Sequence, residues 1–216
     1  MDNKLYSEPP GHPLRRFCLW LLSVFGWQPV FDGFPARKGI FVVYPHTSNR
    51  DFVWGMLFRL GYGLPVHWLA KHSLFRWPFG GLLKKLGGIP VDRRAPRGAI
   101  QALAEEFERH DVMWLGVTPE GTRSHTDHWK TGFYRIALAA GVPCGLGFID
   151  YGRRILGIET FVTFTGDEAT DMGKIAAFYA DKTGRYPGRA SDIRLRNSRE
   201  SEPRESRRAP SGSQGP

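Results

Sequence analysis

The sequence predicts an α/β fold: one domain with a mostly parallel central sheet flanked by helices. Short apolar runs rich in Val, Ile, Phe and Trp alternate with longer segments of helical character. The runs are apolar at nearly every position, as in parallel strands that are buried on both faces. A length of 216 residues with 41% hydrophobic and 24% charged residues suits a folded protein with one core of ordinary size.

The predicted elements follow in regular order, and each apolar run is bounded by turn residues or by a helical segment. We expect strands at residues 39–44, 64–70, 89–91, 112–118, 142–149 and 154–164, and helices at residues 51–62, 79–86, 97–110, 132–140 and 171–181.

Residues 14–27 form the first apolar segment, behind the pair Arg15 and Arg16. About 11 largely apolar residues are too few to span a bilayer, which takes a helix of about 20 residues. Basic residues beside Phe and Trp favour a helix that lies in the lipid interface, and a helix packed on the core is the alternative. We therefore divide the chain into an N-terminal interfacial segment (1–28), one folded domain (29–187) and a tail (188–216).

Residues 188–216 are rich in Arg, Ser, Glu, Pro and Gly and predict a disordered basic tail. The formal charge is +9, and only a third of this surplus lies in the tail, so the folded part is basic and suits a phosphate-bearing partner or an anionic membrane surface. The two cysteines, Cys18 and Cys144, support neither a disulfide framework nor a metal site. With no secretory pattern, we expect the protein on the cytoplasmic face of the plasma (inner) membrane.

His46 and Asp51 are separated by four residues, where a strand passes into a helix. Ser48 or Asn49 would cap the helix, and Asp51 would lie in its first turn, where the helix dipole favours an anion. The carboxylate would then reach one imidazole nitrogen and raise the basicity of the other, as a general base needs. A loop histidine beside a helix cap is the alternative.

Three further segments accompany this pair in a recognisable order. The sequence resembles the glycerolipid acyltransferases, the family of 1-acyl-sn-glycerol-3-phosphate and lysophospholipid acyltransferases, in its short bacterial-type branch. The resemblance covers about residues 26–150. It rests on the His-x4-Asp motif at 46–51, Gly-Ile-Pro-Val-Asp-Arg at 88–93 with Lys71 upstream, Pro-Glu-Gly-Thr-Arg at 119–123, and Gly-Val-Pro at 141–143.

The resemblance implies transfer of an acyl group from an acyl thioester, acyl-CoA or acyl carrier protein, to the hydroxyl of a lysophospholipid, with 1-acyl-sn-glycerol-3-phosphate as first choice. His46 would act as base and Asp51 would orient it. The residues expected to bind substrate are Lys71, Arg93, Glu120, Gly121, Thr122 and Arg123, of which the three basic ones would hold the acceptor's phosphate. No Gly-x-Ser-x-Gly elbow is present, so we expect direct attack without an acyl-enzyme. No metal and no cofactor beyond the thioester co-substrate is expected.

Three alternatives remain open. The basic composition suits nucleic acid, but no recognised nucleic-acid motif accompanies it, so we expect no such partner. A hydrolase would use water as the acceptor at the same base. An acyltransferase for another lysolipid would differ only in its acceptor.

The aromatic residues Phe52, Trp54 and Phe58 line either an acyl-chain channel or simply the core. His125 and His128 lack the further ligands that a metal site needs.

Overall fold

The structure is a computed structural model, which describes residues 11–76, 78, 80–91, 107 and 109–196. A seven-stranded sheet in the order β1-β7-β6-β2-β5-β3-β4 forms its centre. The strands are β1 (Gln28–Phe31), β2 (Lys38–Val43), β3 (Val66–Lys71), β4 (Gly88–Val91), β5 (Met113–Val117), β6 (Cys144–Asp150) and β7 (Ile155–Val162). Strands β6, β2, β5, β3 and β4 are mutually parallel, whereas β7 pairs antiparallel with β6 and parallel with β1. The predicted mostly parallel sheet is confirmed.

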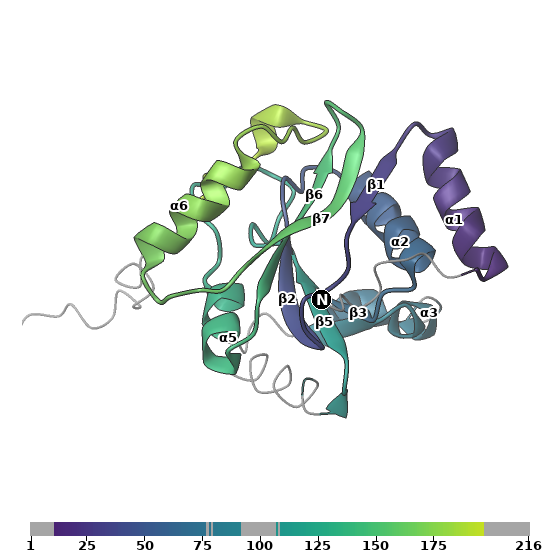
Figure 1. The fold of residues 1–216 in the computed structure, drawn as a ribbon, viewed down its shortest axis with the longest axis horizontal. Coiled ribbons are helices and arrows are strands. Elements are labelled where there is room, and N and C mark those ends of the chain that lie inside the picture. The colour runs from purple at the N-terminus through teal and green to yellow at the C-terminus, as the bar shows by residue number, and fades with distance from the viewer. Residues whose placement is uncertain (1–10, 77, 79, 92–106, 108, 197–216) are drawn as a thin grey trace, which may run out of the picture.

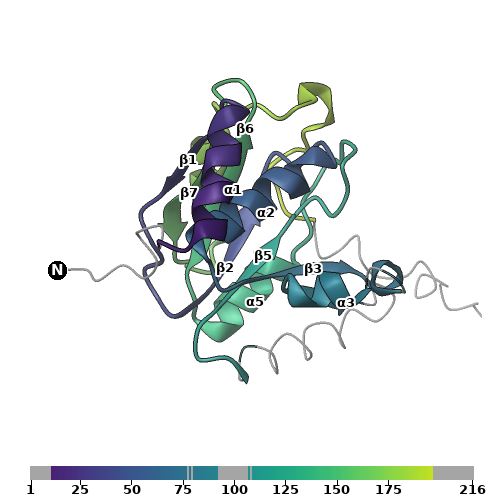
Figure 2. The ribbon, with the colours of Figure 1, turned by 90° about the vertical axis from the view of Figure 1, so that its right-hand side faces the viewer.

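Helices cover both faces of this sheet (Figures 1 and 2). One face carries α1 (Pro13–Val24) and α2 (Arg50–Tyr62), and the other carries α5 (Gly132–Ala140) and α6 (Glu168–Tyr179). The remaining helical segments are α3 (Gly80–Lys85) and the 3-10 turns η1 (His72–Phe75) and η2 (Pro187–Arg189). The result is a three-layer α/β/α domain, as the alternation of elements predicts.

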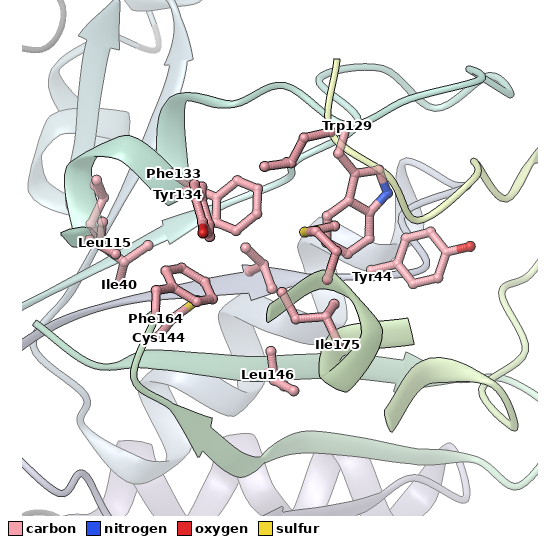
Figure 3. Close-up of a cluster of buried hydrophobic side chains, with 14 of the residues drawn as sticks. Ile40, Tyr44, Leu115, Trp129, Phe133, Tyr134, Cys144, Leu146, Phe164 and Ile175 are labelled. Atoms are coloured by element: carbon pink, nitrogen blue, oxygen red, sulfur yellow. The ribbon is translucent and has the colours of Figure 1, made fainter. Parts of the chain in front are cut away.

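Successive side chains of β2 point to opposite faces of the sheet, so the strand contributes to two separate hydrophobic cores. Ile40 and Val42 face the α5–α6 layer, where Trp129 and Phe133 pack, and Phe41 faces the α1–α2 layer. Figure 3 shows the first of these cores, in which aromatic rings from α5 and the preceding loop pack over the strands. Because both faces are buried, the strand has no polar side and appears in the sequence as a continuous apolar run.

Two boundaries differ from those the sequence predicts. Strand β1 is absent from the prediction, because four residues that include Pro29 give too short a run. The tail boundary at residue 188 is wrong: Ser191 and Leu195 are buried, and Trp129 forms a bridge with Leu195. The folded domain therefore continues to at least Arg196. Most of the helix predicted at 97–110 lies outside the described residues.

Helix α1 confirms the first predicted helix. His12 caps it, since its Nδ1 accepts a hydrogen bond from the backbone N–H of Leu14 at 3.3 Å. Cys18 and Leu22 face inward, and the outward face is apolar and exposed, formed by Leu14, Phe17, Trp20, Val24 and, after the helix, Phe25. None of the helices that the structure describes is both long enough and apolar enough to span a membrane.

Candidate active site

The predicted site residues gather at one edge of the sheet. His46 follows β2, the loop 118–123 follows β5, and Lys71 ends β3, and these three strands are parallel neighbours. The carboxyl ends of parallel strands meet at one edge, where ligands of open α/β sheets usually bind. The fold therefore brings together segments that lie far apart in the sequence.

His46 and Asp51 lie on the turn that links β2 to α2. Asp51 occupies the first turn of α2, as predicted, and His46 stays on the loop. Asn49 stands at the cap position without a side-chain hydrogen bond, while Ser48 Oγ accepts from the N–H of Arg50 at 3.2 Å. Nδ1 of His46 lies 3.4 Å from Oδ2 of Asp51 but makes no hydrogen bond of good geometry. The two groups are in electrostatic contact, and such catalytic contacts commonly tighten when substrate binds.

Asp51 is buried and held from two sides. Its Oδ2 accepts from the N–H of Ser48 at 2.9 Å, and its Oδ1 accepts from the hydroxyl of Tyr151 at 2.7 Å. Burial raises the pKa of Asp51 above its ordinary value, and the hydrogen bonds from Tyr151 and Ser48 oppose this rise. Sequence reasoning missed Tyr151, which follows β6, the strand beside β2.

The imidazole of His46 is neutral at physiological pH. Burial, and then the charge of Arg123, lowers its pKa to about 4. The predicted rise in the basicity of His46 is therefore wrong, because burial disfavours the charged imidazolium more than Asp51, 3.4 Å away, favours it. A neutral imidazole is the form that accepts a proton, so the group is ready to act as a base without first losing one. Its side chain is only 12% exposed, so the ring reaches solvent or substrate over a small area.

Glu120 connects the catalytic turn to the end of the described chain. Its Oε2 accepts from the N–H of His46 at 3.0 Å, and its Oε1 accepts from the N–H of Ser191 at 3.2 Å. Burial raises the pKa of this carboxyl to about 7, against the opposing effect of its hydrogen bonds. Glu120 thus fixes the backbone position of His46 and links it to the segment that contains Ser191.

The loop after β5 turns at Gly121, which has a φ of 64° and donates its N–H to the carbonyl of Thr118 at 3.0 Å. Thr122 Oγ1 accepts from the N–H of Ser124 at 3.3 Å, so its side chain stabilises the loop. Arg123 is exposed, and its charge acts on both His46 and Asp51. The turn at Gly121 therefore leads to an exposed arginine whose charge reaches the catalytic pair.

Two predicted phosphate ligands are less defined. Lys71 ends β3 at the same edge of the sheet, and its side chain is not described. Arg93 lies outside the described residues, two positions beyond the end of β4. Among the described residues, no three His, Cys, Asp or Glu side chains are arranged to hold a metal ion.

A cavity of about 190 Å³ lies between α2 and the sheet, and His46 and Asp51 are part of its wall. Its walls are mainly apolar, with Phe52, Met56, Phe58, Trp68, Leu69 and Ile158 among the lining residues. Phe52 and Phe58 line this cavity, and Phe58 also belongs to the buried core, whereas Trp54 contacts the rings of Phe25 and Trp27. The cavity fits a hydrocarbon chain better than a polar ligand.

Gly55 also lines this cavity, in the middle of α2. A Cβ placed there meets no atom within 4 Å, so the absence of a side chain leaves space open. Glycine inside a helix costs about 0.5–1 kcal/mol relative to alanine. The position therefore gives up helix stability and keeps the cavity wide.

A neutral histidine beside a buried aspartate, an apolar cavity and an exposed arginine lie together here, an arrangement whose chemistry suits proton abstraction by the imidazole. A family model described as Acyltransferase matches residues 31–145, more than half of the chain. The chain belongs to this acyltransferase family, as the motif resemblance predicts.

Curated relatives carry the same assignment. The chain is 29% identical over 131 residues to the 1-acyl-sn-glycerol-3-phosphate acyltransferase of Borreliella burgdorferi, covering 58% of this chain and 51% of the relative. It is 30% identical over 132 residues to the enzyme of that name from Bacillus subtilis (57% and 62%), and 26% over 138 residues to that from Pseudomonas aeruginosa (59% and 52%). The chain thus spans about half to three-fifths of the length of these relatives. No solved structure matches the chain.

Proposed function

We propose that this protein transfers a fatty acyl group from acyl-CoA or acyl carrier protein to the hydroxyl of a lysophospholipid, with 1-acyl-sn-glycerol-3-phosphate as acceptor and phosphatidic acid as product. The observation that carries the proposal is the neutral His46, paired with buried Asp51, in the wall of the apolar cavity. Three family relatives named for this reaction support the choice of acceptor.

The chemistry needs one base and no covalent nucleophile. The ring nitrogen of His46 that faces away from Asp51 takes the proton of the acceptor hydroxyl as the oxygen attacks the thioester carbonyl carbon. The tetrahedral oxyanion then collapses, the C–S bond breaks, and the thiolate leaves with the proton that His46 received. Asp51 holds the imidazole in orientation and stabilises the imidazolium between these steps.

Substrate groups are assigned by their chemistry. The cavity beside α2 takes an acyl chain, because its lining offers few polar partners. Arg123, with Lys71 and Arg93, takes the phosphate of the acceptor, since guanidinium groups offer paired donors to phosphate. Glu120 and Gly121 set the backbone on which Arg123 is presented.

Membrane association belongs to the proposal. The exposed apolar face of α1 places Phe17 and Trp20 outward with exposed fractions of 53% and 57%. Arg16 is exposed on the same helix. A short amphipathic helix of this kind lies in the interface, so we place the protein peripherally on the cytoplasmic face of the inner membrane, where it would meet a lysophospholipid acceptor.

The direct test is product identification. Purified protein with oleoyl-CoA and lysophosphatidic acid should form phosphatidic acid, identified by mass spectrometry, and a panel of lysophospholipids then ranks the acceptors. Oleate released without any esterified product indicates a hydrolase and overturns the proposal. A radiolabelled acyl group that stays covalently on the protein when acceptor is omitted contradicts direct attack.

A further inference from the structure

A cluster of arginine side chains surrounds one exposed tyrosine beside the catalytic turn. The guanidinium carbon of Arg189 lies 4.5 Å from the ring centroid of Tyr186, and that of Arg185 lies 5.4 Å away. Arg50, the first residue of α2, is close enough for its charge to act on the same phenol. The hydrogen bond and charge of Arg185, followed by the charges of Arg189 and Arg50, lower the pKa of Tyr186.

This cluster is attached to the catalytic machinery by backbone and side-chain contacts. The N–H of Tyr186 donates to Oγ1 of Thr47, the residue after His46, at 3.1 Å. Arg185 also interacts with the hydroxyl of Tyr151, which binds Asp51. In Figure 2 the yellow-green segment that contains η2 lies at the upper end of α2, the end at which the helix begins. The arginines therefore lie beside the catalytic turn.

The charges of the cluster are uncompensated by acids in the part of the chain that the structure describes. Arg153 pairs with Asp150 and Asp181, and Arg194 pairs with Asp127, but none of the three guanidinium groups around Tyr186 has a carboxylate partner there. The positive end of the α2 dipole points to the same place. Like charges held together beside a helix N-terminus favour an anion between them.

The reaction brings two different phosphate groups to the site. The acceptor carries one, and the donor carries one on its phosphopantetheine arm, whether the thioester belongs to coenzyme A or to acyl carrier protein. Arg123 lies on the loop after β5, whereas Arg50 is the first residue of α2 and Arg185 lies on the segment after α6. Arg123 therefore acts on His46 directly, and the arginines around Tyr186 are joined to the next residue, Thr47, by the Tyr186 N–H.

We propose that Arg50, Arg185 and Arg189 form a second anion site that binds the phosphopantetheine phosphate of the acyl donor. This inference rests on the proposed function, since it assigns the donor side of the same reaction. The pantetheine arm then runs from this surface site to the thioester at His46, and the acyl chain continues into the cavity. Arginine suits this task because each guanidinium offers paired hydrogen bonds to phosphate oxygens.

The test compares donors that differ only in the phosphate. Wild-type protein is assayed with S-acyl-phosphopantetheine and S-acyl-pantetheine at saturating acceptor, and Arg185→Gln, Arg189→Gln and the double variant are assayed alongside. We expect the wild-type protein to have a higher kcat/KM for the phosphorylated donor. The ratio should be at least about tenfold for each arginine that binds the phosphate, because a hydrogen bond between charged groups contributes that much. The double variant should lose this preference while its KM for lysophosphatidic acid stays unchanged.

Arg37→Gln is the matched control. It removes the same charge from an exposed arginine just before β2, at the opposite end of the strand from His46, and should leave the donor preference intact. Arg189→Lys keeps a point charge without the paired donors and should give an intermediate preference. Equal melting temperatures of all variants exclude misfolding as the cause.

An unchanged donor preference in the double variant would overturn the inference, and so would an equal rise of KM for acceptor and donor. Loss of binding to phosphatidylglycerol vesicles with the donor preference kept would also overturn it, because the arginines would then serve membrane binding. Calorimetric titration of wild-type protein and the double variant with coenzyme A itself separates this inference from the proposed function. Arginine-dependent binding of coenzyme A without any acyl transfer would refute the function and keep the site. Transfer with arginine-independent binding would refute the site alone.

Discussion

Tyr151→Phe is the substitution that tests the support of the catalytic aspartate most sharply. It removes only the hydroxyl that donates to Oδ1 of Asp51 at 2.7 Å and keeps the ring that packs edge-on against Trp27. A hydrogen bond donated to a carboxylate favours its charged form, so its loss raises the pKa of Asp51. Hydrogen bonds to charged groups contribute about 1.5–3 kcal/mol, and one pKa unit corresponds to about 1.4 kcal/mol. The expected rise is therefore about one to two units.

The assay is kcat/KM for acyl transfer as a function of pH. The acid limb of this profile belongs to the coupled His46–Asp51 pair, and it should move to higher pH by about one to two units in Tyr151→Phe, with a smaller change on the plateau. Tyr134→Phe is the control, because it removes a similar hydrogen bond from a tyrosine to Asp171, 2.9 Å long, in the α5–α6 layer. An acid limb that does not move in Tyr151→Phe, or moves equally in the control, would refute the reasoning.

Four further predictions follow. Gly55→Leu fills open space in the cavity, so kcat/KM for long-chain acyl donors should fall by about 5- to 150-fold, as a cost of about 1–3 kcal/mol implies, while a short-chain donor keeps its rate. Glu120→Gln replaces one of two accepting oxygens by an NH2 group that faces a backbone N–H. The free energy of unfolding, measured in urea, should therefore fall by about 1–3 kcal/mol, and kcat should also fall. His46 has a folded pKa of about 4, below its ordinary 6.5, so the unfolded state gains the proton first as pH falls. Between pH 6.5 and 4 the free energy of unfolding of the wild-type protein should therefore fall by up to about 3 kcal/mol more than that of His46→Asn. Urea unfolding at each pH measures this difference. Replacing Phe17 and Trp20 together by Ser should abolish sedimentation with anionic vesicles and leave the melting temperature unchanged, since both side chains are exposed.

Local patterns predict much of this fold. The strands at 39–44 and 112–118 appear in the sequence because burial on both faces makes them continuously apolar. Strand β1 is invisible to the same reasoning, since its four residues gain their strand character by pairing with β7, more than a hundred residues later. Composition also misplaced the end of the domain, because Ile193 and Leu195 are scattered among charged residues and pack on a core that is formed by distant parts of the chain.

The site shows the same division between local and distant information. His46 and Asp51 share one turn, so their spacing predicts their meeting. Tyr151 reaches this turn because β6 lies beside β2, and Ser191 donates to Glu120, which in turn accepts from the N–H of His46; no sequence spacing indicates either contact. The sequence also suggests a hydrogen bond between His46 and Asp51, and the structure shows a 3.4 Å contact instead, with the carboxylate oxygens engaged by other donors.

The acyl-transfer rate of His46→Ala is the most direct test of the central claim, that this imidazole takes the proton of the acceptor hydroxyl. It is measured at saturating oleoyl-CoA and lysophosphatidic acid, with His125→Ala, an exposed histidine on the loop after β5, as the control. A general base contributes roughly 10²–10⁴-fold to a rate, so the account predicts a loss of at least about a hundredfold in His46→Ala and little change in the control. A His46→Ala protein that is folded and transfers acyl groups at close to the wild-type rate would contradict it.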